Sequence, residues 1–271
     1  MPLLPLSEIQ QMSPIFRGMV GGALAGRVMH LLSMDRLNAL YDRHAHLCGP
    51  DFARSVLLDL GVGYEVMGEV LPGISSFITI SNHPYGVLDG IVLADLFGHF
   101  CPDYKIMVNR ILGRVKALSS SFIAVTPIGP TRSTSALDNI GGIKHALTHL
   151  RQGGALGLFP SGAVSDLHLC PYGISDRAWP ISIVRLIAHA QVPIIPVHFL
   201  DRNSLFYYAL GLIDWRVRLL RLPAELFNKS HHPTRLVIGP AISTEEQKEY
   251  LAAHTTDEFG LWLRSKVYDI F

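Results

Sequence analysis

Seven short apolar runs, each of β-strand length, alternate along the chain with longer segments of helical periodicity. The runs lie near Tyr64–Val66, Phe77–Ile80, Ile106–Val108, Phe122–Val125, Ala155–Phe159, Ile194–Phe199 and Leu236–Ile238. Between most of them apolar residues recur three or four positions apart, as in Leu137, Ile140, Ile143, Leu147 and Leu150. This alternation predicts an α/β fold with a mixed, mostly parallel seven-stranded sheet flanked by helices.

Helical patterns also occupy both ends of the chain. An N-terminal stripe at helical spacing consists of Met12, Ile15, Phe16, Met19, Val20, Leu24, Val28, Leu31 and Leu32, with Pro14 near its start, and a second helix is predicted over Met34–Tyr41. The stripe is either the buried face of a core helix or an amphipathic face in a membrane interface. We assign residues 1–60 to this helical extension and residues 61–271 to the α/β domain, the two packing as one unit. Near the other end, Ser243 and Glu246 have capping-box spacing, which predicts that a helix starts there.

The composition is apolar and sparsely charged. Hydrophobic residues make up 49% and charged residues 17% of the 271 positions, against about 25% charged in an average protein. The 23 Lys and Arg nearly cancel the 22 Asp and Glu, for a net charge of +1. This balance excludes a disordered chain and argues against a nucleic-acid partner, which would need a basic surface. Contact with a membrane surface would account for the apolar excess.

A membrane-spanning helix is not expected, and neither is secretion. The longest stretch without Asp, Glu, Lys or Arg, Val70–Leu88, is broken by prolines and glycines, and the N-terminus has no basic region before its apolar residues. Three widely spaced cysteines, Cys48, Cys101 and Cys170, favour a reducing compartment over a disulfide framework. We therefore expect a cytoplasmic protein that is peripheral on the inner face of the cell membrane.

The segment from Ser81 to Gly90 carries the best local signal for chemistry. A predicted strand ends at Ile80, a loop with Pro84 and Gly86 follows, and Asp89 opens the next helix. Sites in α/β sheets form beyond the carboxyl ends of strands, and a carboxylate that orients an imidazole makes it a general base. On spacing alone this remains one of two interpretations, since Asp89 can be a helix cap and His83 an ordinary turn residue.

The same residues resemble a known family. Asn82-His83 followed by Asp89-Gly90 is similar to the first block of the lysophospholipid acyltransferase superfamily, which includes glycerophosphate and lysophosphatidate acyltransferases. Five residues separate His83 from Asp89 where the usual block has four, and this longer form resembles the hemolysin-like branch that includes lyso-ornithine lipid acyltransferases.

Three further blocks follow in the superfamily's order. Val108-Asn109-Arg110 resembles the second block, Phe159-Pro160-Ser161-Gly162 the third, and Val192–Val197 the fourth. The resemblance covers about residues 35–245. It implies that His83 and Asp89 are catalytic and that the substrate is bound by Asn82, Gly86, Asn109, Arg110, Phe159, Pro160, Ser161 and Gly162.

The third block departs from the family pattern at two positions. Ser161 stands where the family has Glu, and Val164 stands where it has an Arg that supplies positive charge for a phosphate. A valine cannot bind phosphate, so a lysophosphatidate acceptor requires another cation, such as Arg110 or Arg132. An acceptor with an amino-acid head group, such as a lyso-ornithine or lyso-glycine lipid, needs no phosphate clamp.

The resemblance implies an O-acyltransferase of bacterial phospholipid or amino-acid-lipid synthesis. His83, oriented by Asp89, would deprotonate the hydroxyl of a lysolipid, which then attacks an acyl thioester of acyl carrier protein or coenzyme A. Backbone amides in the loops after the Phe77 and Ala155 runs are candidate oxyanion donors. No cofactor and no metal is expected.

Two other functions stay open, and so does the role of one basic segment. The altered third block would also suit a non-catalytic protein of this fold that binds lipid or acyl carrier, and the same scaffold with water as acceptor would be a hydrolase. In the segment behind Trp215, the arginines Arg216, Arg218 and Arg221 either meet anionic lipid head groups or belong to a plain basic surface helix.

Overall fold

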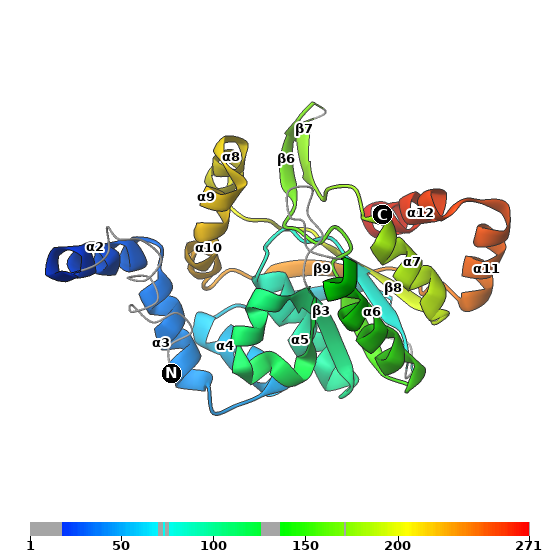
Figure 1. Ribbon diagram of the computed structural model, residues 1–271, viewed down its shortest axis with the longest axis horizontal. Coiled ribbons are helices and arrows are strands. Elements are labelled where there is room, and N and C mark those ends of the chain that lie inside the picture. Colours follow the sequence, from blue (N-terminus) through cyan, green and yellow to red (C-terminus); the bar gives the residue numbers. More distant parts are fainter. Residues whose placement is uncertain (1–17, 70–72, 74–75, 126–135, 171, 271) are drawn as a thin grey trace.

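A seven-stranded sheet forms the centre of the protein (Figure 1). The computed structural model describes residues 18–69, 73, 76–125, 136–170 and 172–270. Its sheet has the order β1-β9-β8-β2-β5-β3-β4. The strands are β1 (Tyr64–Gly68), β2 (Ile78–Ser81), β3 (Tyr104–Asn109), β4 (Phe122–Val125), β5 (Ala155–Leu158), β8 (Ile194–Phe199) and β9 (Thr234–Ile238). Only β8 and β9 pair antiparallel, so the prediction of a mixed, mostly parallel sheet is confirmed.

Helices cover both faces of this sheet, which explains why its strands are apolar runs rather than alternating patterns. Every residue of β2 and of β5 is buried. One face packs against α3 (Met34–His44), α4 (Gly49–Leu60) and α5 (Leu88–Phe100), and the other against α6 (Ala136–Arg151), α7 (Ile181–Ala190) and α12 (Thr256–Tyr268). The strands β2, β3, β4, β5 and β8 run in one direction, and β1 and β9 run in the other. The loops after β2, β3 and β5 therefore lie at one edge of the sheet.

The N-terminal residues that the structure describes are helical. The helix α2 spans Gly18–Leu31, and α3 confirms the second predicted helix. Met12, Ile15 and Phe16 of the predicted stripe lie outside the described residues. Residues of α3 and α4 share the core cluster of α5, with the rings of Tyr41 and Phe52 5.7 Å apart. No helix within the described ranges is both long and apolar enough to cross a membrane.

The C-terminal helical segment is two helices. Ser243 caps α11 (Thr244–Ala253) as predicted, since its hydroxyl accepts a hydrogen bond from the Glu246 amide at 3.1 Å. The expected continuation is a separate helix, α12, because Thr255 and Glu258 form a complete capping box that starts a new one.

Two features at the sheet edge do not follow from the apolar periodicity. A two-stranded antiparallel hairpin, β6 (Asp166–Leu169) and β7 (Tyr172–Ser175), comes directly after the third sequence block. After β8 the chain forms three short helices, α8 (Leu205–Ile213), α9 (Trp215–Leu220) and α10 (Leu222–Asn228). The hairpin and α8–α9 project from the same side of the sheet (Figure 1). Turns of 3₁₀-helix, η2 (Arg110–Arg114) and η3 (Lys116–Ser121), follow β3.

Candidate active site

The loop between β2 and α5 brings His83 and Asp89 together. His83 follows the end of β2, Asp89 lies in the first turn of α5, and the loop between them folds back so that Nδ1 of His83 is 2.8 Å from Oδ2 of Asp89. The His83 side chain stays 15% exposed whereas that of Asp89 is fully buried. With Nδ1 facing the carboxylate, the second ring nitrogen, Nε2, is the one free to exchange a proton.

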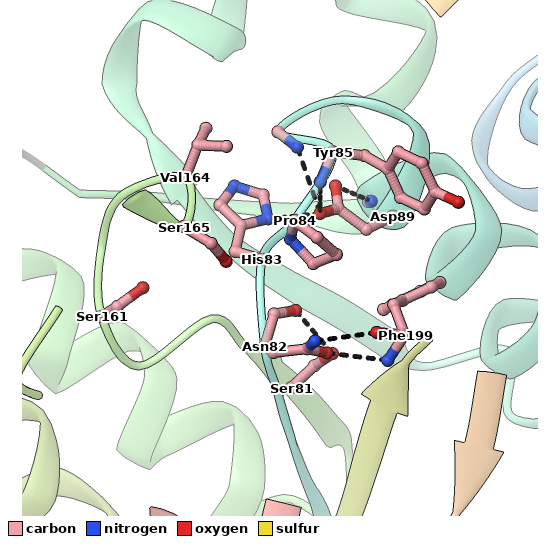
Figure 2. Close-up of polar contacts among 12 residues, drawn as sticks. Ser81, Asn82, His83, Pro84, Tyr85, Asp89, Ser161, Val164, Ser165 and Phe199 are labelled. Carbon is pink, nitrogen blue, oxygen red and sulfur yellow. Dashed lines mark hydrogen bonds and ion pairs between the residues drawn. The ribbon is translucent and has the colours of Figure 1, made fainter. Parts of the chain in front are cut away.

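Backbone amides donate hydrogen bonds to both oxygens of the Asp89 carboxylate. Oδ2 accepts hydrogen bonds from the amides of Tyr85 and Gly86, each at 3.1 Å, and Oδ1 accepts one from Gly90 at 2.9 Å (Figure 2). Such bonds stabilise a carboxylate. Val87, and not Asp89, is the N-cap of α5. The interpretation of Asp89 as a helix cap is therefore wrong, and its carboxylate faces His83 instead.

The surroundings of His83 change its basicity in opposing directions. Burial lowers the pKa of the imidazole, but the charge of Asp89, its hydrogen bond and the charge of Asp176 raise it more, so that the pKa of His83 lies above its usual value. A raised pKa makes the neutral imidazole a stronger base.

Asp176 is a buried carboxylate beside His83 that the sequence did not single out. It follows β7, and its Oδ1 accepts hydrogen bonds from the His83 amide at 3.2 Å and from the Ser165 hydroxyl at 2.5 Å. The Ser165 amide in turn donates to the His83 carbonyl at 2.9 Å. Burial raises the pKa of Asp176 above its usual range. Asp176, after β7, and Ser165, just before β6, therefore bond the amide and the carbonyl of His83. Both contacts join segments that are far apart in the chain, so no local motif predicts them.

The third block packs directly on the imidazole. The ring of Phe159 stacks on that of His83 with 4.0 Å between centroids and 28° between planes. Pro160 and Ser161 are buried, and the Ser161 hydroxyl donates to the Ala163 carbonyl at 2.8 Å within its own turn. Gly162 adopts a positive φ of 65° in that turn. The block therefore packs against the His83 ring and restricts its orientation.

Val164 lies in an apolar cluster next to His83 (Figure 2). Its neighbours in the cluster are Tyr207 and Tyr208 of α8 and Leu222 of α10. Gly86 faces it, at a φ of 80° and so close that an added Cβ would lie 2.6 Å from the valine Cγ2. The place where the family pattern has a phosphate-binding arginine is thus filled by packed apolar side chains.

An arginine does reach the third block, but from α9 and into its backbone. Arg218 is buried; its guanidinium donates to the Ser165 carbonyl at 3.0 Å and the Val164 carbonyl at 3.2 Å, and pairs with Asp166 at 2.8 Å. Arg177 also pairs with Asp166, and the two cations together hold the pKa of this carboxyl below its usual value despite burial. Neither interpretation of the Trp215 segment is correct for Arg218, which points inward, while Arg216 is exposed.

Of the remaining predicted binding residues, Asn82 is buried just after β2, whereas Asn109 and Arg110 are exposed at the sheet edge. Asn82 is buried, with its amide bonded to both backbone groups of Phe199 in β8, at 2.7 and 2.9 Å. Asn109 ends β3 and Arg110 begins η2, both exposed, at the same sheet edge as His83 but beyond β5. Arg132 lies outside the described residues.

Several amides expected to bind an oxyanion have other partners. Those of His83, Tyr85 and Gly86 donate to Asp176 or Asp89, and the Gly162 amide donates to the Phe159 carbonyl at 2.9 Å. These four amides hold Asp89, Asp176 and the turn of the third block, so an oxyanion donor in the two loops would have to be another amide. The expectation of such donors stays a prediction. Among the described residues, no group of three or more His, Cys, Asp or Glu side chains is arranged to hold a metal ion.

Comparison with known proteins identifies the family. A family model described as Acyltransferase matches residues 15–270. The chain belongs to the acyltransferase family. The predicted resemblance to the lysophospholipid acyltransferase superfamily is thereby confirmed, and so is the expectation that the protein is an enzyme of this class.

Two curated relatives of this acyltransferase share one name. The chain is 28% identical over 223 residues to the lyso-glycine lipid O-acyltransferase of Phocaeicola vulgatus, covering 79% of this chain and 76% of the relative. It is 26% identical over 221 residues to the protein of the same name from Bacteroides thetaiotaomicron, covering 78% of each. Among solved structures, the 1-acyl-sn-glycerophosphate acyltransferase PlsC from Thermotoga maritima matches with a TM-score of 0.47 and 13% identity, covering 81% of this chain and 80% of that one.

Proposed function

We propose that this acyltransferase moves a fatty acyl group from an acyl thioester to the hydroxyl of a lysolipid with an amino-acid head group, of the lyso-glycine lipid type. The names of the two curated relatives support this acceptor class. The apolar cluster around Val164 supports it too, because it leaves no cation at the position where relatives of the phosphate-binding kind carry one.

The observation that carries the chemistry is the ion pair of His83 with buried Asp89. Nε2 of His83 takes the proton from the acceptor hydroxyl while Asp89 stabilises the imidazolium that forms. The acceptor oxygen attacks the thioester carbonyl, and the tetrahedral intermediate collapses to the new ester and a thiolate. The thiolate recovers the proton from His83 and leaves as the thiol, so no acyl-enzyme is formed and no cofactor is needed.

The donor is a thioester of acyl carrier protein or of coenzyme A. Both deliver the same carbonyl to the acceptor, and both leave as a thiol. The acceptor is a lipid, so we place the reaction at a membrane surface, on the inner face of the cell membrane where these donors are found.

The experiment compares the purified protein with His83→Ala in an assay of lyso-glycine lipid with acyl carrier protein and coenzyme A thioesters, read by mass spectrometry. We expect the wild type to form the diacyl product and the variant to lose turnover by about 10³-fold or more, because it has no base. His145→Ala, which removes an exposed histidine of α6, is the matched control and should turn over like the wild type.

Three other outcomes would contradict the proposed mechanism or the proposed function. Turnover retained by a folded His83→Ala variant would overturn the mechanism. Free fatty acid from the donor alone would indicate a hydrolase, and lipid binding without turnover by the wild type would indicate a non-catalytic binding protein.

A further inference from the structure

The outer face of α8 and α9 is apolar and exposed. Of the ten exposed residues in these two helices, nine are apolar and the tenth is Arg216. Eight of the seventeen large hydrophobic side chains that are exposed in the described structure lie here, including Ile213 at 81%. Soluble surfaces scatter such side chains singly, and a contiguous group marks an interaction surface. We call this face the apolar patch.

The tip of the β6–β7 hairpin extends the apolar patch. Leu169 and Tyr172 at the tip are 68% and 70% exposed, and α8 packs against β6. The hairpin and the two helices project on the same side of the sheet (Figure 1). The tip and the patch are therefore positioned to meet one broad surface together.

The inner faces of the same helices form hydrogen bonds with the His83 loop and the third block. The Tyr208 hydroxyl of α8 donates to the Pro84 carbonyl at 2.7 Å, and Arg218 of α9 binds the third block at Val164 and Ser165. Asn203, just before α8, donates to the Tyr85 carbonyl at 3.0 Å. The elements that expose apolar side chains outward are thus bonded inward to the loop that carries His83.

The polar groups of the patch suit the head-group region of a bilayer. The exposed Arg216 guanidinium lies 5.3 Å from the centre of the Trp215 ring. Arg221, at the border of the patch, lies 4.9 Å from the Phe206 ring and also pairs with Glu225 at 3.5 Å. Tryptophan and arginine beside apolar side chains are typical of the membrane–water interface, and arginine attracts anionic lipids. Helices of nine and six residues are too short to span the bilayer but can lie in its interface.

We propose that the apolar patch, with the hairpin tip, is the surface by which the enzyme docks on a bilayer containing anionic lipid, with the His83 loop held directly behind it. The proposal rests on the proposed function, since a lysolipid acceptor resides in such a bilayer. Docking through this face brings the acceptor to the side of the enzyme where its hydroxyl is needed.

The test is flotation of the full chain with phosphatidylcholine vesicles made with and without phosphatidylglycerol. Phe206→Ser/Ile213→Ser removes two apolar side chains from the patch, and Leu58→Ser/Leu261→Ser removes two that are equally exposed on α4 and α12. We expect the patch variant to bind vesicles weaker by about tenfold for each side chain removed, and the control to bind like the wild type. Phosphatidylglycerol should strengthen binding and added salt should weaken it.

The outcomes separate this surface from the catalytic mechanism. Wild-type protein that does not float, or a patch variant that floats like the control, overturns the proposal. A patch variant that only abolishes self-association on gel filtration also overturns it, by making the patch a contact between copies. Turnover of detergent-dispersed acceptor by the wild type is measured in parallel: vesicle binding without turnover contradicts the proposed function alone, and turnover without vesicle binding contradicts the docking surface alone. Circular dichroism confirms that both variants are folded.

Discussion

His83 takes its chemical character from two buried carboxylates on different elements. Asp89 approaches the ring at Nδ1 from α5, while Asp176 binds the backbone amide from the end of β7. Both charges raise the pKa of the imidazole, with Asp89 contributing more. If His83 is the general base, these two carboxylates set the pH dependence of the enzyme.

Asp89→Asn keeps the shape of the side chain but removes the charge that orients and stabilises His83. We expect kcat to fall by about 10³–10⁴, as for the equivalent change in other Asp–His pairs. A base works in its neutral form, so kcat/KM rises as pH rises through the His83 pKa. Because loss of the Asp89 charge lowers this pKa, the acidic limb of the profile should move to lower pH while its plateau falls. An acidic limb that stays in place would contradict the assignment. Asp51→Asn, at an exposed carboxylate 3.1 Å from His99, is the control.

Gly86 is required by its backbone and by its neighbours. Alanine there would adopt a left-handed φ of 80° and place its Cβ 2.6 Å from Val164 and 2.9 Å from Leu222. We expect Gly86→Ala to lower the free energy of unfolding by about 1–3 kcal/mol, measured by urea denaturation. Gly90→Ala, four residues on in α5 with open space around it, should instead be neutral or stabilising. Equal effects of the two would show that packing at Val164 is not the cause.

At the scale of elements, α9 and the hairpin are joined by one buried guanidinium. Arg218 bonds two carbonyls of the third block and pairs with Asp166. A short hairpin has little stability of its own, so this contact and the cluster around Val164 anchor β6, while Tyr268 and Arg264 of α12 bond the Asp176 backbone at the end of β7.

Arg218→Met should therefore destabilise the protein by about 3–5 kcal/mol, because it leaves two buried carbonyls without their donor and leaves Asp166 paired with Arg177 alone. Arg218→Lys keeps the charge but not the planar fork and should recover only part of the loss. Arg216→Met, two residues away and exposed, should change stability by less than about 0.5 kcal/mol. Thermal unfolding of the three variants checks this order; an Arg216 effect as large as that of Arg218 would contradict it.

At the scale of the whole molecule, two apolar layers enclose the sheet. One includes α3–α5 and the other α6, α7 and α12. In α12, Leu263 is fully buried in the second layer while Leu261 is 69% exposed. We expect Leu263→Ala to lower the free energy of unfolding by about 2–5 kcal/mol and Leu261→Ala to have almost no effect. Similar values for the two, in urea denaturation, would mean that α12 does not cover the sheet.

Much of this arrangement was predictable from local patterns. All seven predicted strands and the helices α3, α6 and α7 are present, because apolar period and length report burial of a segment on its own. The approach of His83 to Asp89 was suggested by the six positions between them, but spacing alone left it as one of two interpretations, and the family resemblance was needed to favour it. The Ser243 cap was correct, but the Thr255 cap that divides the last helices was overlooked.

Local patterns in the chain specify the strand and helix segments and favour a mostly parallel sheet, and the short loop between His83 and Asp89 allows these two side chains to meet. Each of these features depends on residues close together in the chain. The tertiary structure alone decided the strand order, the approach of Asp176 to His83 over 93 positions and that of Arg218 to Val164 over 54. Periodicity tells which face of a segment is buried but not which segment buries it. Those contacts arise only when parallel strands far apart in the chain end at one edge and their loops meet there.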